Sequence, residues 1–322
     1  MLTSHVFPEG DSIGSEVALA LHLRERGKTV QILNPTPARP CYRFLMDLFP
    51  ARYLGQNGAP PIPPGTEILI ALDVSQWSYI GPLAEILRSS GLPVVSVDHH
   101  HPIGDFGDLE LIDPSACSTG EMLYHYFRWA GVRIDPDIAQ ALYASLMFDT
   151  GGLRLPQTTN RAVLVAADLL RHGADHASVA RWIFQSESFE RFDLYRRALA
   201  NLRHERDGKV AWLSVPHTTF VETRTVLQDG DGILDNLLAI QNIDLCILFR
   251  EVLGSGVRVT FRSKGKHDVG ALATRIGGGG RPTAAGAFLP GTISEAEELV
   301  LPMVRRLYDR TMAPKPQRLY CD

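Results

Sequence analysis

Residues 93–100 read Pro-Val-Val-Ser-Val-Asp-His-His, an apolar run that ends in one acid and two histidines. The apolar run predicts a buried strand, and the three polar residues follow at its carboxyl end. Ligands of open parallel sheets bind outside the carboxyl ends of the strands. Asp98, His99 and His100 are therefore candidates for a metal or phosphate site, provided that other segments bring similar side chains to the same place.

The sequence around this run alternates apolar strands with helices. Nearly continuous apolar strands between helices are typical of a parallel sheet that is covered on both faces, which predicts an α/β fold. The prolines of residues 59–65 predict a loop. The other strands are predicted at residues 2–6, 29–33 and 67–73, and the helices at residues 13–26, 81–90, 119–130 and 136–148.

The second half of the chain has a different pattern, which predicts a smaller α+β domain. Helices are predicted at residues 160–173, 175–201, 233–240 and 268–276, and strands at residues 209–215, 243–249 and 256–262. We expect a first domain of residues 1–185, a helical linker of residues 186–204 and a second domain of residues 205–322. The tail at residues 312–322 is expected to be mobile.

Composition narrows the class of protein. The chain has 322 residues, of which 45% are hydrophobic and 21% are charged, as in ordinary globular proteins. Its four cysteines are scattered without a CxxC pair, which argues against a zinc ribbon or a disulfide framework. The net charge of −4 argues against a protein that coats long nucleic acid. We find no apolar run of roughly 20 residues for a membrane span and no signal peptide, so we expect a cytoplasmic protein without a membrane partner.

Further acids and histidines fall at equivalent positions in the predicted sheet. His5, Glu9 and Asp11 follow the first strand, Asp73 ends the strand at residues 67–73, and Asp149 follows an apolar helix. Each has an ordinary interpretation when taken alone, such as a turn, a helix cap or a hydrogen-bonded core histidine. Together they would place many costly polar groups on one rim, which favours a functional site.

Carboxylates and imidazoles in such a cluster can hold two divalent cations about 4 Å apart. Such a pair lowers the pKa of bound water and neutralises a phosphate. Many carboxylates, few histidines and no thiolates favour Mn²⁺ or Mg²⁺ over a structural zinc, with Co²⁺ as a further alternative.

The same residues resemble the motifs of a known family. Residues 4–15, Ser-His-Val-Phe-Pro-Glu-Gly-Asp-Ser-Ile-Gly-Ser, resemble the first motif of the DHH phosphoesterase superfamily, S-H-x-x-P-D-G-D-x-x-G-S. Asp73 matches the aspartate of the second motif, residues 98–100 match the third, and residues 149–151 resemble the fourth. Residues 277–286 resemble the G-G-G-G-H-x-x-A-A-G motif of the DHH-associated C-terminal domain. These five ordered motifs cover nearly the whole chain and are most similar to the nanoRNase (oligoribonuclease)/pAp phosphatase group.

The resemblance implies roles for individual residues. His5, Glu9 and Asp73 would hold one Mn²⁺. Asp11, Asp73, His99 and Asp149 would hold the second, with Asp73 shared between the two. His100 would face the scissile phosphate and Asp98 would orient the histidines, so the expected catalytic residues are His100, Asp98 and Asp73. The attacking group would be a hydroxide that bridges the metals.

The C-terminal domain is expected to bind the substrate. Gly278, Gly279 and Gly280 allow close backbone approach and can form an anion nest. Arg262 and Arg281, with Ser263 beside the first, can grip a terminal phosphate. Arg250 and Arg275 are expected to be ordinary surface or ion-pair residues.

The chain departs from the family pattern at two positions. Glu9 replaces the usual Asp, and Arg281 replaces the usual His of the glycine motif. Glu is a good oxygen ligand, so we expect the first metal to be retained. Arg keeps a phosphate donor but cannot titrate.

The resemblance implies a Mn²⁺-dependent phosphoesterase. Its substrates would be short 5′-phosphorylated oligonucleotides (nanoRNA), 3′-phosphoadenosine 5′-phosphate (pAp), or both. The alternatives are a linear or cyclic dinucleotide phosphodiesterase and a nucleotide-binding protein with a degenerate site. The expected partners are short oligonucleotides or small nucleotides and, because the family often dimerises, a second copy of the chain.

Overall fold

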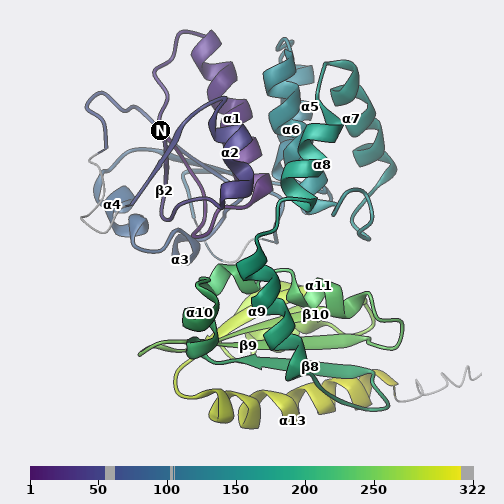
Figure 1. The fold of residues 1–322 in the computed structure, drawn as a ribbon. Helices are drawn as coiled ribbons and strands as arrows, with labels where there is room; N and C mark the ends of the chain where they lie inside the picture. The colour runs from purple at the N-terminus through teal and green to yellow at the C-terminus, as the bar shows by residue number, and fades with distance from the viewer. Residues whose placement is uncertain (55–61, 102–103, 105, 313–322) are drawn as a thin grey trace, which may run out of the picture. The chain divides into compact units, whose positions relative to one another are not determined.

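The computed structural model describes residues 1–54, 62–101, 104 and 106–312 (Figure 1). The chain divides into two compact units, Met1–Ser186 and Glu187–Asp322. Residues 59–61 of the predicted loop at residues 59–65, and residues 313–322 of the predicted tail at residues 312–322, lie outside the described residues. Within the described part, no helix combines the length and the apolar character that crossing a membrane requires.

The first unit is built on a six-stranded sheet with the order β3-β2-β1-β4-β5-β6. All of its strand pairs are parallel, which confirms the predicted α/β architecture. The edge strands β3 and β6 were missed because each has only three or four residues, Ala-Arg-Tyr and Leu-Glu-Leu-Ile, and a charged residue interrupts the apolar ones. The strands are β1 (Leu2–Thr3), β2 (Ile32–Asn34), β3 (Ala51–Tyr53), β4 (Leu69–Leu72), β5 (Val94–Asp98) and β6 (Leu109–Ile112).

The helices of the first unit enclose a large apolar core around α1 and α6. A Cβ atom added to Gly14 of α1 would lie 2.5 Å from the carbonyl oxygen of Ala141 in α6, so glycine permits this close packing. The helices are α1 (Gly10–Glu25), η1 (Pro40–Tyr42), α2 (Arg43–Met46), α3 (Trp77–Ile80), α4 (Leu83–Ser89), α5 (Thr119–Trp129), α6 (Pro136–Asp149), α7 (Asn160–Arg171) and α8 (His176–Phe184).

The prediction of a single helix at residues 175–201 is wrong. The structure has two helices there, α8 and α9 (Phe189–Ala200). The Ser188 hydroxyl accepts a hydrogen bond from the Arg191 amide, which starts α9 afresh. Leu194 and Ala198 of α9 belong to an apolar cluster of the second unit. The division into domains of residues 1–185 and 205–322 with a linker between them stays a prediction.

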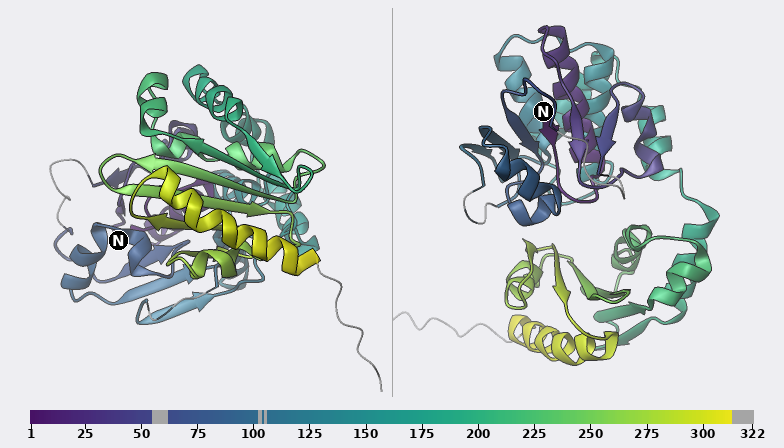
Figure 2. Two further views of the ribbon diagram at one scale, coloured as in Figure 1. Left: turned by 90° about the horizontal axis from the view of Figure 1, so that it is seen from below. Right: turned by 90° about the vertical axis from the view of Figure 1, so that its left-hand side faces the viewer.

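The second unit has a mixed six-stranded sheet with the order β11-β12-β10-β9-β8-β7, in which only β8 and β9 pair in parallel. Helix α13 lies along one face of this sheet (Figure 2). The strands are β7 (Arg203–Glu205), β8 (Val210–Val215), β9 (Leu245–Val252), β10 (Gly256–Ser263), β11 (Gly279–Arg281) and β12 (Ala284–Leu289). The remaining helices are α10 (His217–Thr223), η2 (Leu227–Gly230), α11 (Ile233–Leu238), α12 (Val269–Thr274) and α13 (Ile293–Met312).

Six elements of the second unit were not predicted from the sequence: β7, α10, η2, β11, β12 and α13. Helix α13 was missed, although Ala296, Val300 and Val304 recur at helical spacing and are buried; Pro302 interrupts the pattern. Arg250 was expected to be a surface or ion-pair residue, and it is an ion-pair residue: its side chain is only 1% exposed and pairs with Asp231 at 2.8 Å. The ion pair compensates part of the cost of burying the guanidinium.

Candidate metal centre

Side chains from five segments meet at the carboxyl edge of the first sheet, as the sequence predicted. Two of these segments are the chain after β1, which carries His5, and the first turn of α1, which carries Asp11. The others are the end of β4 before Asp73, the end of β5 with residues 98–100, and the last turn of α6 with Asp149. Asp73 has a φ angle of 58°, in the left-handed region that favours glycine. Backbone of this kind persists where surrounding contacts fix it, and it concentrates at functional sites.

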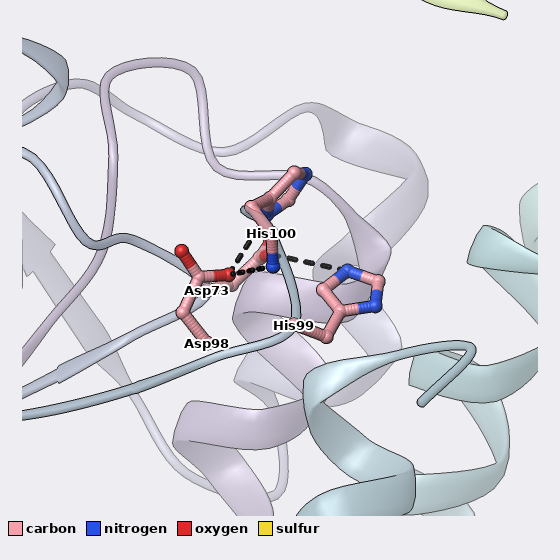
Figure 3. Close-up of side chains that lie close together, drawn as sticks. All are labelled: Asp73, Asp98, His99 and His100. Atoms are coloured by element: carbon pink, nitrogen blue, oxygen red, sulfur yellow. Dashed lines mark hydrogen bonds and ion pairs between the residues drawn. The ribbon is translucent and has the colours of Figure 1, made fainter. Parts of the chain in front are cut away.

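Asp73 is central to the cluster, and its two oxygens face different neighbours. Oδ1 lies 3.7 Å from His99 Nε2 and 3.5 Å from His100 Nδ1 (Figure 3). Oδ2 accepts a hydrogen bond from the Ser12 hydroxyl at 2.6 Å and lies 3.4 Å from His5 Nε2. Oδ1 is buried and accepts no hydrogen bond from the described residues, which is costly for a carboxylate oxygen unless a cation faces it. Asp73 therefore has the position that a shared ligand of two cations would need.

His99 and His5 are each oriented by a backbone carbonyl. His99 Nδ1 lies 3.2 Å from the carbonyl oxygen of Ala116, and His5 Nδ1 lies 2.7 Å from that of Val6. When Nδ1–H donates to a carbonyl in the neutral ring, Nε2 keeps its lone pair for a metal. His99 Nε2 lies 3.0 Å from Asp149 Oδ2 and 3.4 Å from Asp11 Oδ2. Both imidazoles thus present Nε2 to the carboxylates.

Asp11 is fixed by hydrogen bonds that the sequence did not reveal. Oδ2 accepts from the Thr119 amide at 2.8 Å, and Oδ1 accepts from the Gly120 amide at 3.1 Å. Oδ1 also accepts from the hydroxyls of Ser145 at 2.6 Å and Ser15 at 3.2 Å. The two amides begin α5, where unpaired N–H groups favour an anion. The carboxylate is held rigidly, with Oδ2 facing His99.

His100 differs from the other two histidines because its side chain is 44% exposed. Asp98 Oδ1 accepts from the backbone amide of His100 at 3.0 Å and pairs with its Nδ1 at 2.8 Å. The ring is thereby oriented with Nδ1 toward the protein, which leaves Nε2 for a ligand. The buried Asp98 thus orients the ring of His100.

Two groups of side chains have ligand atoms close enough to hold a cation. One consists of Asp73, Asp98, His99 and His100, and the other of Asp11, His99 and Asp149. Among the described residues, His5 and Glu9 belong to neither group. Glu9 is half-buried at the start of α1, and its charge acts on His5. The structure thus brings together the predicted metal-ligating residues, with Glu9 at the margin.

The charges of the cluster shift several pKa values. Burial opposes protonation of His99 and His5. Asp149 nevertheless raises the pKa of His99 to about 10, and Asp73 raises that of His5 to about 9. Burial, and then the charges of Asp73 and Asp149, raise the pKa of Asp11 to about 7. Protons thus take the place that divalent cations would fill, and a cation that binds here would displace them.

Glu16, on the same side of α1 as Ser12, is a further buried acid that the sequence prediction missed. Its Oε2 accepts from the Asn34 amide group at 2.8 Å, and Asn34 Oδ1 accepts from the Ser4 amide at 3.0 Å. This chain of hydrogen bonds fixes the backbone directly before His5. Burial raises the pKa of Glu16 to about 8. Glu16 follows Ser12 by four residues, a spacing that places both side chains on the same side of a helix. The sequence could have indicated its position from this spacing.

The predicted substrate-binding residues lie on the second sheet. Arg262 of β10 and Arg281 of β11 both stand opposite Ala284 of β12, so their side chains share one face. Ser263 does not share it. Its buried hydroxyl accepts from the amides of Gly265 at 3.1 Å and His267 at 3.3 Å, within the turn that follows β10.

The predicted glycine nest is corrected by the structure. Gly279 and Gly280 belong to β11 and pair with Gly286 and Ala285 of β12, so they do not form an open anion-binding loop. A Cβ atom on Gly280 would lie 2.5 Å from the Ala284 carbonyl oxygen, and one on Gly278 would clash with that of Gly286. These glycines allow two strands to approach closely, which a sequence pattern alone does not distinguish from a nest.

Comparison with known proteins assigns both units. Residues 1–146 match the DHH family, N-terminal domain, and residues 221–308 match the DHHA1 domain. The chain is 30% identical over 310 residues to the bifunctional oligoribonuclease and PAP phosphatase NrnA of Thermus thermophilus, covering 94% of this chain and 88% of the relative. It is 26% identical over 292 residues to the NrnA of Bacillus subtilis, covering 90% of this chain and 88% of that one.

A crystal structure of an exopolyphosphatase-related protein from Bacteroides fragilis has the same fold, with a TM-score of 0.81 and 22% sequence identity. That similarity covers 96% of this chain and 92% of the other. The chain belongs to the DHH family, whose members are phosphoesterases, and carries its DHHA1 domain.

Proposed function

We propose that the protein is a Mn²⁺-dependent phosphoesterase that hydrolyses short 5′-phosphorylated oligonucleotides (nanoRNA), 3′-phosphoadenosine 5′-phosphate, or both. The observation that carries the proposal is the position of Asp73, whose oxygens face His5 on one side and His99 on the other. The names of the NrnA relatives, which match nearly the whole chain, support the substrate class.

We assign His5, Glu9 and Asp73 to one cation and Asp11, Asp73, His99 and Asp149 to the second. Two features fit this assignment. Asp73 Oδ1 is buried without a hydrogen-bond partner among the described residues, and both histidines turn Nε2 toward carboxylates, His5 toward Asp73 and His99 toward Asp149. A donor set of carboxylates and imidazoles without thiolates favours Mn²⁺, with Mg²⁺ or Co²⁺ as alternatives. When bound, two such cations supply a hydroxide nucleophile near neutral pH and neutralise the phosphate.

The side chains around the cations hold and move protons. His100 donates Nδ1–H to Asp98, so its Nε2 is the nitrogen that would meet the scissile phosphate or the departing oxygen. Hydrogen bonding to His100 outweighs burial and lowers the pKa of Asp98, which keeps this carboxylate charged and the ring oriented. Asp73, Asp98 and His100 are therefore our proposed catalytic residues.

The second unit is proposed to bind the substrate. Arg262 and Arg281 both stand opposite the small residue Ala284, and we propose that they hold a phosphate, for which Arg262 would exchange its 3.4 Å contact with the exposed Asp235. Ser263 and the glycines at positions 278–280 contribute by fixing the turn and the strand pair beside these arginines. We further propose that the enzyme works in the cytoplasm as a homodimer, on short oligonucleotides or small nucleotides rather than long nucleic acid.

A substrate panel tests this function. The full chain is incubated with Mn²⁺ and 5′-pApA, longer 5′-phosphorylated oligonucleotides, pAp, and linear and cyclic dinucleotides, and the products are separated. We expect turnover of 5′-pApA, pAp or both. If the chain binds Mn²⁺ and is folded but hydrolyses neither, the proposal fails. Tight nucleotide binding without hydrolysis would point to a degenerate site, and turnover of only a cyclic dinucleotide to the alternative activity.

A further inference from the structure

One face of the second sheet is only half covered by apolar side chains of the described residues. On this face, the buried apolar side chains come from β8 and β9 and from α9, α10 and α11. Over β10 and β12 the same face instead presents polar, small or exposed residues. They are Arg258, Thr260, Arg262, Ala284, Gly286 and Phe288, and we call them the open half-face.

The strand register orders the open half-face into rows. Arg262 stands opposite Ala284, Thr260 opposite Gly286, and Arg258 opposite Phe288. Arg281 continues the first row on the far side of Ala284. One end of the open half-face therefore has Arg262 and Arg281 around the small residue Ala284. The middle has the short side chains of Thr260 and Gly286, and the other end has the ring of Phe288 beside Arg258.

Phe288 is 51% exposed, although its neighbours Ala287 and Leu289 are buried. A single exposed apolar side chain is common and needs no explanation. This ring is distinguished by its surroundings, because it shares a face with the guanidinium groups of Arg258 and Arg262. The combination of positive charge, a low floor and an aromatic ring is complementary to a nucleotide, which has a phosphate and a flat base.

We propose that Phe288 is the stacking platform for a nucleobase of the substrate, while Arg262 and Arg281 hold a phosphate of the same molecule; this rests on the proposed function. The four residue steps along β10 from Arg262 to Arg258 span about 13 Å between Cα atoms, and the long arginine side chains shorten the gap between guanidinium group and ring. Stacking on an aromatic ring tolerates any base, because every base has a π face. The surface would thus select nucleotides over phosphates that lack a base, without choosing a base.

Comparison of two substrates isolates this contribution. The Mn²⁺-loaded enzyme is assayed with two substrates, 5′-pApA and the same 5′-phosphorylated dinucleotide with both bases removed. Stacking of one base corresponds to about 5- to 100-fold in kcat/KM. We expect Phe288→Ala to lose this factor on 5′-pApA, mainly through a higher KM, and to be unchanged on the abasic substrate. Phe288→Trp should restore the activity.

Controls separate this proposal from the proposed function. Phe192→Ala removes another exposed ring of the second unit, 68% exposed on α9, and should leave both substrates unchanged. An equal loss on both substrates with Phe288→Ala, or no loss on 5′-pApA, would overturn the stacking role. If Phe288→Ala also dissociates a dimer and loses activity equally on both substrates, the open half-face binds a second copy of the chain, and the stacking role is overturned too.

If wild-type protein hydrolyses neither substrate, the proposed function fails, and stacking is then tested by binding alone. A 5′-phosphorylated 2-aminopurine nucleotide should be quenched by wild type and Phe288→Trp but not by Phe288→Ala. Equal quenching by all three proteins would contradict the proposal.

Discussion

The rim of the first sheet and the open half-face of the second hold their functional side chains in different ways. On the rim, nearly every functional group is buried and fixed by a second group, as His99 is by the Ala116 carbonyl and Asp11 by the amides of Thr119 and Gly120. On the open half-face, Phe288 is half exposed, and Arg262 pairs at 3.4 Å with Asp235, an exposed carboxylate. Chemistry that needs rigid charges is built into a core, whereas recognition that must accept several ligands uses an exposed sheet.

This difference predicts that losses on the rim are large and affect kcat, whereas losses on the open half-face are moderate and affect KM. The largest effect is expected for Asp73→Asn, because it removes the charge that the two proposed cation sites share. Activity with Mn²⁺ should fall by roughly 10³-fold or more, and bound Mn²⁺ should decrease. Steady-state kinetics and metal analysis measure both. Asp47→Asn, an exposed carboxylate that follows α2, is the matched control and should change neither.

A second change separates two neighbouring histidines of the rim. His100→Gln should lower kcat by roughly 10²-fold while Mn²⁺ content stays near that of wild type, because we assign this ring to the phosphate and not to a cation. His99→Gln should lose metal as well as activity. Equal metal loss in both variants would show that His100 is a ligand, and the proposed assignment would then be wrong.

On the open half-face, Arg262→Gln should raise KM for 5′-pApA by about 10-fold with little change in kcat. The reason is that its charge-assisted hydrogen bond to a terminal phosphate affects binding more than the chemical step. Removing that phosphate from the substrate should abolish the difference between variant and wild type. Arg275→Gln changes an exposed arginine of the same unit and serves as control. A collapse of kcat in Arg262→Gln would contradict the contrast between the two regions.

The smallest effect concerns pH and should appear only in the first unit. Without metal, the pKa values of His5 and His99 lie at about 9 and about 10, above their ordinary value of 6.5. These raised values stabilise the fold fully below about pH 6.5, and the stabilisation is lost as pH rises through 9 to 10. The raised pKa of Asp11, about 7, acts in the same direction between about pH 4 and 7.

The Tm of metal-free protein should therefore fall by a few degrees as pH rises from about 6 to about 9. Mn²⁺ should restore more stability at the higher pH than at the lower, because it competes with protons for the histidines. Hydrogen exchange should localise the change to the first unit. A Tm that rises with pH in the absence of metal would refute the charge balance inferred for the rim.

The sequence predicted the two regions unequally well. The end of an apolar strand such as β5 can be recognised in the sequence, because polar residues follow the apolar run. The sequence alone was therefore enough to place Asp98, His99 and Asp73 on one rim. The cradle around Asp11 could not be predicted, because the amides of Thr119 and Gly120 have no side-chain signature. The glycine run was interpreted as a nest but forms β11, since close strand packing and anion binding both require glycine. The edge strand β6, Leu-Glu-Leu-Ile, has only four residues, which is a very short pattern for prediction.

The most direct test of the account follows the release of mononucleotide from 5′-pApA while Mn²⁺ is titrated into metal-free full-length protein. Turnover should rise from near zero and level off when about two Mn²⁺ are bound per chain, and Asp73→Asn should remain inactive at the same Mn²⁺ concentrations. A folded protein that binds Mn²⁺ and still releases no mononucleotide from 5′-pApA and no phosphate from pAp would contradict the account.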